Sequence, residues 1–341
     1  MEISAICHDN GRVVTLSDRA ADFTCRPIVT CNERMLSSLA MLESVAATDL
    51  RILISGEPGC NKQDYAEYIH RLSARSERPY IRFDCAATHE SRYEERLFGA
   101  VTATAEGNRV RPGVLEACGG GTVLLDSIST VPEAFCEKLE RMVESGTVVR
   151  RGSREKTAVD VRLLATCAED LMLLMHRNRR MAELLQHLTA VRMDVLPLRQ
   201  RKEDVALLTL HYLQEACERY GTRKRMGSAL FREILDYSWP GNERELKSFV
   251  EQMVLVSPGE VVDDPGLIRS TARLTASLLP EWKRSAETVG GGERPLREQV
   301  NEYELMIIRR CIGKYGSLRK AARALQVDPS VLSRKLAAAK E

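Results

Sequence analysis

The stretch GGGTVLLDSIS, residues 119–129, combines a short apolar run with a carboxylate at its end, Asp126. A buried parallel strand that delivers an acidic residue at its carboxyl end is how many nucleotide enzymes hold Mg²⁺. The next residue is expected to be a second acid that polarises the attacking water, but here it is Ser127. The stretch therefore leaves three possibilities open: nucleotide hydrolysis, nucleotide binding without hydrolysis, or neither.

Short apolar runs alternate with helical patterns around this stretch. RILIS, YIRFD, TVLLD and VRLLAT have the length and composition of strands, and residues 63–76 and 133–146 have the apolar spacing of helices. This alternation predicts an α/β fold over residues 25–202, a parallel sheet with helices on both faces. Residues 203–283 predict a helical lid and a following segment, with no strand-like run between 203 and 258.

The two ends of the chain differ from this central part. Residues 1–24 are too few for a domain, and residues 284–295 are rich in glycine and polar residues, as in a linker. Residues 296–341 predict a separate module of three helices, the last of which begins sharply at Asp328 and Pro329. From residue 313 onward the module has seven basic residues against two acidic ones, which favours contact with phosphates.

Composition excludes several classes of protein. The 50 basic residues nearly balance the 48 acidic ones, so net charge alone indicates no nucleic-acid partner. The ten cysteines form no CxxC pair and do not cluster with the six histidines, which favours reduced, buried thiols over zinc sites or disulfides. The chain shows neither a signal-peptide pattern nor an apolar run long enough for a bilayer, so we expect a soluble, cytoplasmic protein without a membrane partner.

A glycine-rich turn between a strand and a helix precedes the opening stretch. ISGEPGCNKQ, residues 54–63, matches the phosphate-loop pattern GxxxxGK[ST] at Gly56 and Lys62. In that pattern backbone N–H groups cradle phosphates and the lysine reaches the outer ones. Asn61 replaces the second glycine and is the non-glycine residue that best tolerates a left-handed conformation, whereas Gln63 replaces the hydroxyl that binds Mg²⁺. By itself the match is equally compatible with a simple turn.

From residue 25 to about 258 the chain resembles the AAA+ domain of the sigma-54-dependent bacterial enhancer-binding activators. The resemblance rests on GEPGCNK, RLFG, GVLEACGGGTVLLDSI, DVRLLAT, LPLRQRKEDV and WPGNEREL, which follow the family's order with near-family spacing. It implies an AAA+ fold with a helical lid, and ATP with Mg²⁺ as cofactors. The nucleotide-binding positions that it implies are Gly56, Gly59, Asn61, Lys62, Gln63, Asp126 as the Mg²⁺ ligand, and Arg244 as the second sensor arginine.

The resemblance also locates the family's catalytic positions, and this chain departs from the family at each of them. Ser127 stands in place of the glutamate that orients the attacking water, and Asp84 in place of the asparagine that restrains that glutamate. Cys167 replaces the first sensor asparagine, while Met181 and His187 replace two arginines that reach the neighbouring subunit's nucleotide. A positioned base contributes about 10²–10⁴ in rate and an arginine finger about 10³–10⁵. We therefore predict no catalytic residue at these positions and no turnover, whereas nucleotide binding stays an open alternative.

Two further segments bear on the partners of the chain. The family carries a GAFTGA loop that engages sigma-54, whereas residues 99–113 read GAVTATAEGNRVRPG and lack its phenylalanine, so we predict that sigma-54 is not remodelled. Residues 296–341 resemble the family's Fis-type helix-turn-helix, and residues 296–312 are expected to pair with a second copy. The DNA-binding positions that this implies are Ser330, Val331, Ser333 and Arg334 at base edges and Arg319, Lys320 and Lys335 near the backbone.

These observations predict a DNA-binding transcription regulator with a degenerate AAA+ domain. Its expected partners are double-stranded DNA, further copies of the chain as a dimer or higher oligomer, and RNA polymerase as a further candidate. One alternative is a working sigma-54 activator ATPase with an unorthodox active site. Another is an interaction protein that has lost ATP and keeps only DNA contact and self-association. For the C-terminal module alone, the alternative is a solvated basic face on an oligomerisation bundle.

Overall fold

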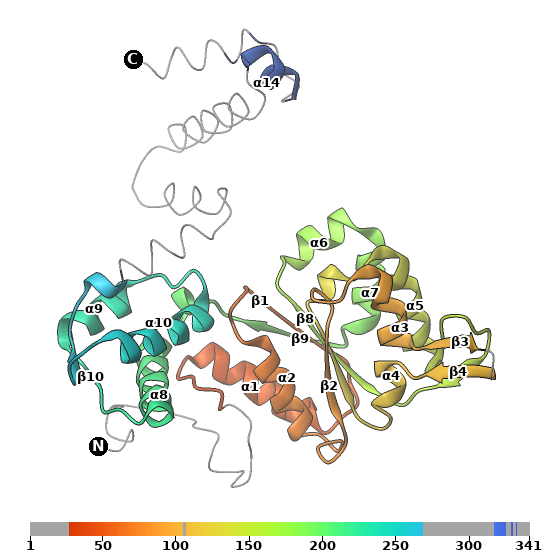
Figure 1. Ribbon diagram of the computed structural model, residues 1–341, viewed down its shortest axis with the longest axis horizontal. Coiled ribbons are helices and arrows are strands. Elements are labelled where there is room, and N and C mark those ends of the chain that lie inside the picture. The colour runs from red at the N-terminus through yellow and green to blue at the C-terminus, as the bar shows by residue number, and fades with distance from the viewer. Residues whose placement is uncertain (1–26, 105–106, 269–316, 325–328, 330–331, 333–341) are drawn as a thin grey trace. The chain divides into compact units, whose positions relative to one another are not determined.

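The structure, a computed structural model, describes residues 27–104, 107–268, 317–324, 329 and 332. The chain divides into two compact units, residues 1–269 and 270–341. The first contains a parallel sheet with its helices and a helical subdomain (Figure 1). In the second, the described helix is α14 (Leu318–Ala324). The predicted N-terminal extension and linker lie outside the described residues.

Five strands form the central sheet in the order β2-β5-β8-β1-β9. They are β1 (Ile52–Gly56), β2 (Tyr80–Asp84), β5 (Thr122–Asp126), β8 (Arg162–Cys167) and β9 (Val191–Val195). Every neighbouring pair is parallel, and the register of β2 on β5 places Asp84 beside Asp126 at the carboxyl edge of the sheet. The predicted α/β fold with a parallel sheet is therefore confirmed.

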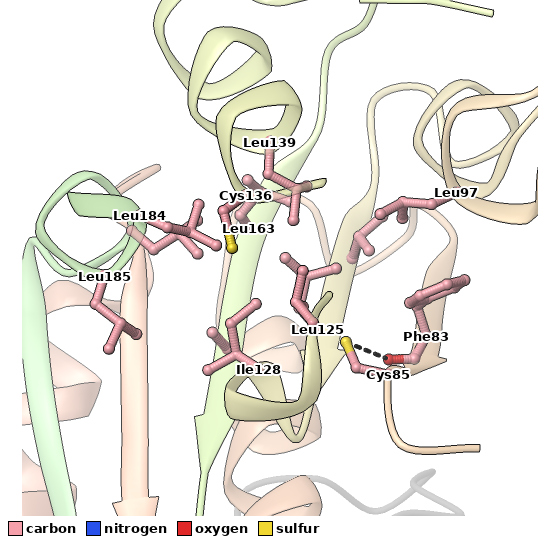
Figure 2. Close-up of a cluster of buried hydrophobic side chains, with 14 of the residues drawn as sticks. Phe83, Cys85, Leu97, Leu125, Ile128, Cys136, Leu139, Leu163, Leu184 and Leu185 are labelled. Carbon is pink, nitrogen blue, oxygen red and sulfur yellow. Dashed lines mark hydrogen bonds between the residues drawn. The ribbon is translucent and has the colours of Figure 1, made fainter. Parts of the chain in front are cut away.

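Helices cover both faces of this sheet (Figure 1). The helices of the α/β part are α1 (Glu33–Ala46), α2 (Lys62–Arg71), α3 (Glu90–Phe98), α4 (Val114–Ala117), α5 (Glu133–Ser145), α6 (Leu171–Arg177) and α7 (Arg179–Leu188), with short 3-10 turns η3 (Ile128–Thr130) and η4 (Leu198–Gln200). Since side chains alternate along a strand, β5 directs Leu124 into one core with α1 and α2, and Val123 and Leu125 into the other with α3, α5 and α7. Figure 2 shows the second core around Leu125 and Leu163.

Two small antiparallel hairpins extend from the α/β part. One pairs β3 (Ala100–Thr104) with β4 (Gly107–Arg111), and the other pairs β6 (Thr147–Val149) with β7 (Lys156–Ala158). Two backbone hydrogen bonds connect the two hairpins, from the Val101 N–H to the Arg151 carbonyl at 2.8 Å and from the Arg151 N–H to the Gly99 carbonyl at 2.9 Å. The segment expected to be a loop after RLFG is therefore a β-hairpin in its described residues.

The helical subdomain surrounds the buried indole of Trp239. Its helices are α8 (Lys202–Tyr220), α9 (Ser228–Asp236) and α10 (Asn242–Val256). A parallel pair of two-residue strands, β10 (Arg225–Met226) and β11 (Val261–Val262), lies beside them. The prediction that residues 203–258 contain no strand is wrong at β10, because two residues are too few to show an alternating pattern.

Two expectations from composition concern the described residues as a whole. None of the described helices combines the length and apolar character that a bilayer crossing requires. The cysteines in the described part of the chain are free thiols, most of them buried.

Candidate nucleotide site

The turn between β1 and α2 has the backbone geometry of a phosphate loop. Asn61, just before α2, has φ +48° and ψ +40°, so the left-handed conformation expected for this asparagine is present. Its side-chain amide donates to Oε2 of Glu243 at 3.2 Å. A Cβ at Gly59 would lie 2.1 Å from the carbonyl oxygen of Gly241, so the loop packs directly on the backbone of the lid.

Lys62, at the first position of α2, is folded onto its own loop. Its Nζ donates to the carbonyl oxygens of Gly56 at 2.8 Å and Glu57 at 2.9 Å, and only 8% of the residue is exposed. Burial lowers the pKa of the Lys62 ammonium, and the nearby Asp126 carboxylate opposes that shift. A bound phosphate would therefore replace two carbonyl partners of this lysine. Gln63 follows it, half-buried, on the first turn of α2.

Asp126, at the end of β5, is engaged on both carboxylate oxygens. Arg82 on β2 donates to its Oδ2 from Nε at 2.7 Å, and Nη2 of the same guanidinium forms an ion pair with this oxygen at 2.5 Å. The Thr166 hydroxyl at the end of β8 donates to its Oδ1. The carboxylate that was expected to hold Mg²⁺ is thus paired with a guanidinium, and reasoning from the sequence had not assigned Arg82 to the site.

The first turn of the lid helix α10 rests on the phosphate loop. Asn242 donates from Nδ2 to the Glu57 carboxylate at 3.2 Å and to the Pro58 carbonyl at 3.1 Å. The backbone N–H of Arg244 donates to the carbonyl of Gly59 at 3.1 Å. These bonds hold the exposed side chain of Arg244 beside the loop, where its charge contributes to the lowered pKa of Lys62. The structure therefore brings the implied nucleotide-binding residues from the loop, β5 and the lid into one region.

A cavity of about 210 Å³ opens beside the N-terminal end of α2. Three parts of the first unit line it: the segment 27–29, α2 through Asn61 and Tyr65, and the lid helices through Tyr212 and Glu243. Its lining combines apolar and aromatic side chains with polar and charged ones, among them Asp64, Glu215 and Lys247. The sequence offered no signal for this cavity, since its walls come from three distant segments.

Comparison with known proteins assigns the family. The model of the sigma-54 interaction domain matches residues 28–194, and the model of the AAA+ ATPase lid domain matches residues 199–277. The chain belongs to the sigma-54-dependent regulator family. The AAA+ architecture with a helical lid, implied by resemblance, is thereby confirmed.

Relatives of known name agree with this family. The chain is 34% identical to the sigma54-dependent transcriptional regulator SfnR of Pseudomonas fluorescens over 238 residues, 69% of this chain and 65% of SfnR. It is 32% identical to the transcriptional regulatory protein ZraR of Escherichia coli K12 over 307 residues, 89% of this chain and 66% of ZraR. The chain thus spans less than two thirds of the length of these relatives.

Solved structures of NtrX from Brucella abortus are similar in fold. The crystal structure of NtrX in complex with ATP shares 26% identity and a TM-score of 0.64, over 91% of this chain and 68% of NtrX. The complex of NtrX with ADP shares 26% identity and a TM-score of 0.66, over 91% of this chain and 69% of NtrX.

The positions near Asp126 that the resemblance implies as catalytic lie at the carboxyl edge of the sheet. Ser127 has φ +60°, and its N–H donates to the Thr166 hydroxyl at 2.9 Å. Asp84 accepts from the N–H of Ala87 at 2.9 Å, which commits one of its oxygens to a local turn. Cys167 is fully buried, and this burial raises the pKa of its thiol. Ser127 and Cys167 therefore bring no acidic or amide group to the site.

The two positions expected to face a neighbouring subunit lie on α7. Met181 is fully buried in the core between α7 and α5, so it does not project outward. His187 is half-exposed, with Nδ1 3.6 Å from Oε1 of Glu144. Arg180, which precedes Met181, lies 3.7 Å from the carboxylate of Glu183 on the same helix. Neither of these two positions therefore presents an arginine side chain.

A buried charge network beneath the loop was also missed at the level of sequence. Arg201, fully buried at the start of the lid, pairs with Glu243 and lies 3.5 Å from Oδ2 of Asp204. Glu243 in turn accepts from Asn61 and from the Tyr212 hydroxyl, each at 3.2 Å. Asp204 lies within LPLRQRKEDV and Glu243 within WPGNEREL, two of the blocks on which the family resemblance rests. These blocks were the only features of the sequence that could have pointed to the network.

Proposed function

We propose that this chain is a DNA-binding transcription regulator whose AAA+ domain binds ATP but neither hydrolyses it nor remodels sigma-54. The observation that carries the proposal is Ser127, which follows Asp126 where a water-polarising carboxylate is needed. Its backbone position beside Thr166 leaves a short hydroxyl side chain at the edge of the sheet. A hydroxyl cannot take up a proton from water as a carboxylate does near neutral pH.

Retention of nucleotide has independent support. The structural relative NtrX binds both ATP and ADP, with a similar fold over most of this chain. The loop around Asn61 keeps its left-handed turn, and Lys62 lies with its ammonium on the loop. Backbone N–H groups at a helix N-terminus with one lysine suffice to hold phosphates. The cavity next to α2 would accept the base, since it lies at the same helix end as the loop.

Loss of hydrolysis follows from the combined substitutions. A positioned base supplies about 10²–10⁴ in rate and an arginine finger about 10³–10⁵, so losing both leaves turnover near background even if the effects are not additive. The test is steady-state phosphate release alongside ATP titration by calorimetry. We expect ATP binding that disappears in Lys62→Ala and no phosphate release above background. Phosphate release that vanishes in Lys62→Ala would contradict the proposal.

Loss of sigma-54 remodelling rests on the β3–β4 hairpin. Among its described residues the exposed side chains are small or polar at Thr102, Ala103 and Asn108, and Val110 is half-exposed. A single valine buries much less apolar area than an aromatic tip. Membership of the family still suggests contact with sigma-54 or RNA polymerase, and we propose that such contact does not depend on ATP turnover.

DNA binding is assigned to residues 296–341. Lys320 is exposed on α14, where Arg319 also lies, whereas the positions proposed for base edges, as well as Lys335, lie outside the described residues. The helix expected to form a dimer, residues 296–312, is outside them too. Genome-wide DNA occupancy would identify the operator class, and removal of residues 296–341 should abolish specific duplex binding. Unchanged affinity after that truncation would overturn this assignment.

One observation favours the alternative of a working ATPase. Asp84 retains a half-exposed carboxylate beside Asp126, with Oδ2 3.7 Å from Nη2 of Arg82. A carboxylate in this place could serve as an unorthodox base. Phosphate release that is lost equally in Asp84→Asn and Lys62→Ala would establish that alternative.

A further inference from the structure

We infer that the nucleotide site of this chain works without a divalent cation, because the Arg82 guanidinium holds the Asp126 carboxylate that Mg²⁺ would need. The inference rests on the proposed binding of ATP and concerns whether a metal cation is bound together with the nucleotide. It makes Arg82 a specificity-determining residue for metal-free nucleotide.

The residues present do not fit Mg²⁺. This ion requires octahedral oxygen ligands at about 2.0–2.1 Å. Asp126 Oδ2 already accepts the Nε–H of Arg82 at 2.7 Å and lies 2.5 Å from Nη2 of the same guanidinium, and its Oδ1 accepts the Thr166 hydroxyl. A metal on the same carboxylate would face the Arg82 guanidinium cation across one oxygen atom. The loop residue that should supply a hydroxyl ligand is Gln63.

Strand geometry explains why Arg82 reaches this carboxylate. In the register of β2 on β5, Arg82 lies opposite Leu124, two residues before Asp126 and therefore on the same face of the sheet. The next residue, Phe83, points to the opposite face and is buried in the core with α3 and α5. Residues offset by two on neighbouring strands are within reach of a long side chain. The planar fork of arginine can direct two N–H groups at one carboxylate, which an ammonium cannot do with fixed geometry.

The local charge balance shows what Arg82 contributes. Lys62 and Arg244 are two cations at the loop. The charges of both Asp126 and Arg244 influence the pKa of Lys62, so all three groups lie close together. An unpaired Asp126 would repel the phosphates and would need a metal ion to reverse its charge. Paired with Arg82, the carboxylate is neutralised within the protein, so the triphosphate meets no uncompensated negative charge there.

The test measures ATP affinity by isothermal titration calorimetry in Mg²⁺ and in EDTA, using the full chain, Arg82→Ala, Arg82→Gln and the control Arg141→Ala. Arg141 is exposed on α5, on the other face of the sheet, where it pairs with Glu137. The parent and Arg141→Ala should bind with affinities that differ less than about threefold between the two buffers. Both Arg82 variants should lose about tenfold or more in EDTA and regain affinity when Mg²⁺ is added.

The outcomes separate this inference from the proposed function. ATP affinity of the parent that falls about tenfold or more in EDTA would overturn the metal-free site while leaving nucleotide binding in place. Absence of ATP binding by the parent in both buffers would overturn the proposed function itself. Circular dichroism shows whether each variant is folded. The comparison of the parent's ATP affinity in Mg²⁺ and in EDTA tests the inference even if the variants do not fold. Equal affinity of folded Arg82→Gln in both buffers would remove Arg82 from the explanation.

Discussion

Replacing Arg201 with methionine would test how strongly the buried network joins the lid to the α/β part. Arg201 is fully buried and donates to the Leu196 carbonyl at 3.0 Å, to Glu243, and to Asp204 at 3.5 Å. Methionine keeps much of the side-chain volume but removes the charge and all of these donors. The variant therefore isolates the electrostatic part of the contact from its packing.

The expected loss follows from what each acceptor retains. Asp204 keeps three donors from residues 30–32, so its carboxylate stays satisfied. Glu243 loses the partner of its Oε1, and the Leu196 carbonyl loses the Arg201 N–H. A lost hydrogen bond to a buried charge costs about 1.5–3 kcal/mol and an orphaned carbonyl about 1–3 kcal/mol. The free energy of unfolding should thus fall by about 3–5 kcal/mol, as when one partner of a buried ion pair is removed.

Urea denaturation followed by circular dichroism would measure this change, with thermal unfolding as a second readout. A loss of this size lowers Tm by about 6–20 °C for a unit of some 150–250 residues. The matched control is Arg141→Met, which breaks the exposed pair with Glu137 and should change stability by less than about 0.5 kcal/mol. A loss below about 1 kcal/mol in Arg201→Met would refute the claim that this network holds the two parts together.

Three further predictions concern the loop and its surroundings. In Gly59→Ala the new Cβ would lie 2.1 Å from the Gly241 carbonyl oxygen of the lid, at a residue with φ +85°. This variant should displace the lid and weaken ATP binding, measured by calorimetry, about tenfold or more, and unchanged affinity would contradict the prediction. Asn61→Ala should cost about 1–3 kcal/mol in urea denaturation, from left-handed strain and the lost bond to Glu243, whereas Asn61→Gly should cost less than half of that. Burial lowers the pKa of His70 below its ordinary 6.5, so the folded state takes up a proton less readily than the unfolded chain. The contribution of neutral His70 to the free energy of unfolding is therefore present above pH 6.5 and is lost as the pH falls further. His70→Gln should flatten the dependence of this free energy on pH between about pH 5 and 7, and an unaltered slope would exclude His70 as the cause.

The central strands of the sheet were predictable because they are buried on both faces, and the edge strand β2 was predictable from YIRFD. β5 and β8 are continuous apolar runs because helices cover both of their sides, and both were predicted within a residue or two. β9, at the edge of the sheet, alternates buried with exposed residues and includes Arg192 and Asp194, so it showed no apolar run. The β3–β4 hairpin was missed because AVTAT and GNRVR consist mainly of small and charged residues with little alternation.

In the candidate site, features set by neighbouring residues could be predicted from the sequence, whereas contacts between distant segments could not. The left-handed conformation of Asn61 could be predicted from residue type and position in the loop alone. The pairing of Arg82 with Asp126 could not, because 44 residues separate them and only the register of two parallel strands brings them together. The inward direction of Met181 likewise depends on how α7 packs against α5.

The buried contacts around the loop support the proposal that this domain binds nucleotide. The contacts that shape the loop are present: Asn61 reaches Glu243, Arg201 anchors Glu243, and Asn242 donates to the loop carbonyl at Pro58. Breaking any one of these buried polar contacts would leave an unsatisfied group at a cost of about 1–3 kcal/mol. Neither Ser127 nor the buried Met181 takes part in these contacts. The loop and lid therefore keep the contacts that the proposed binding of nucleotide without hydrolysis requires.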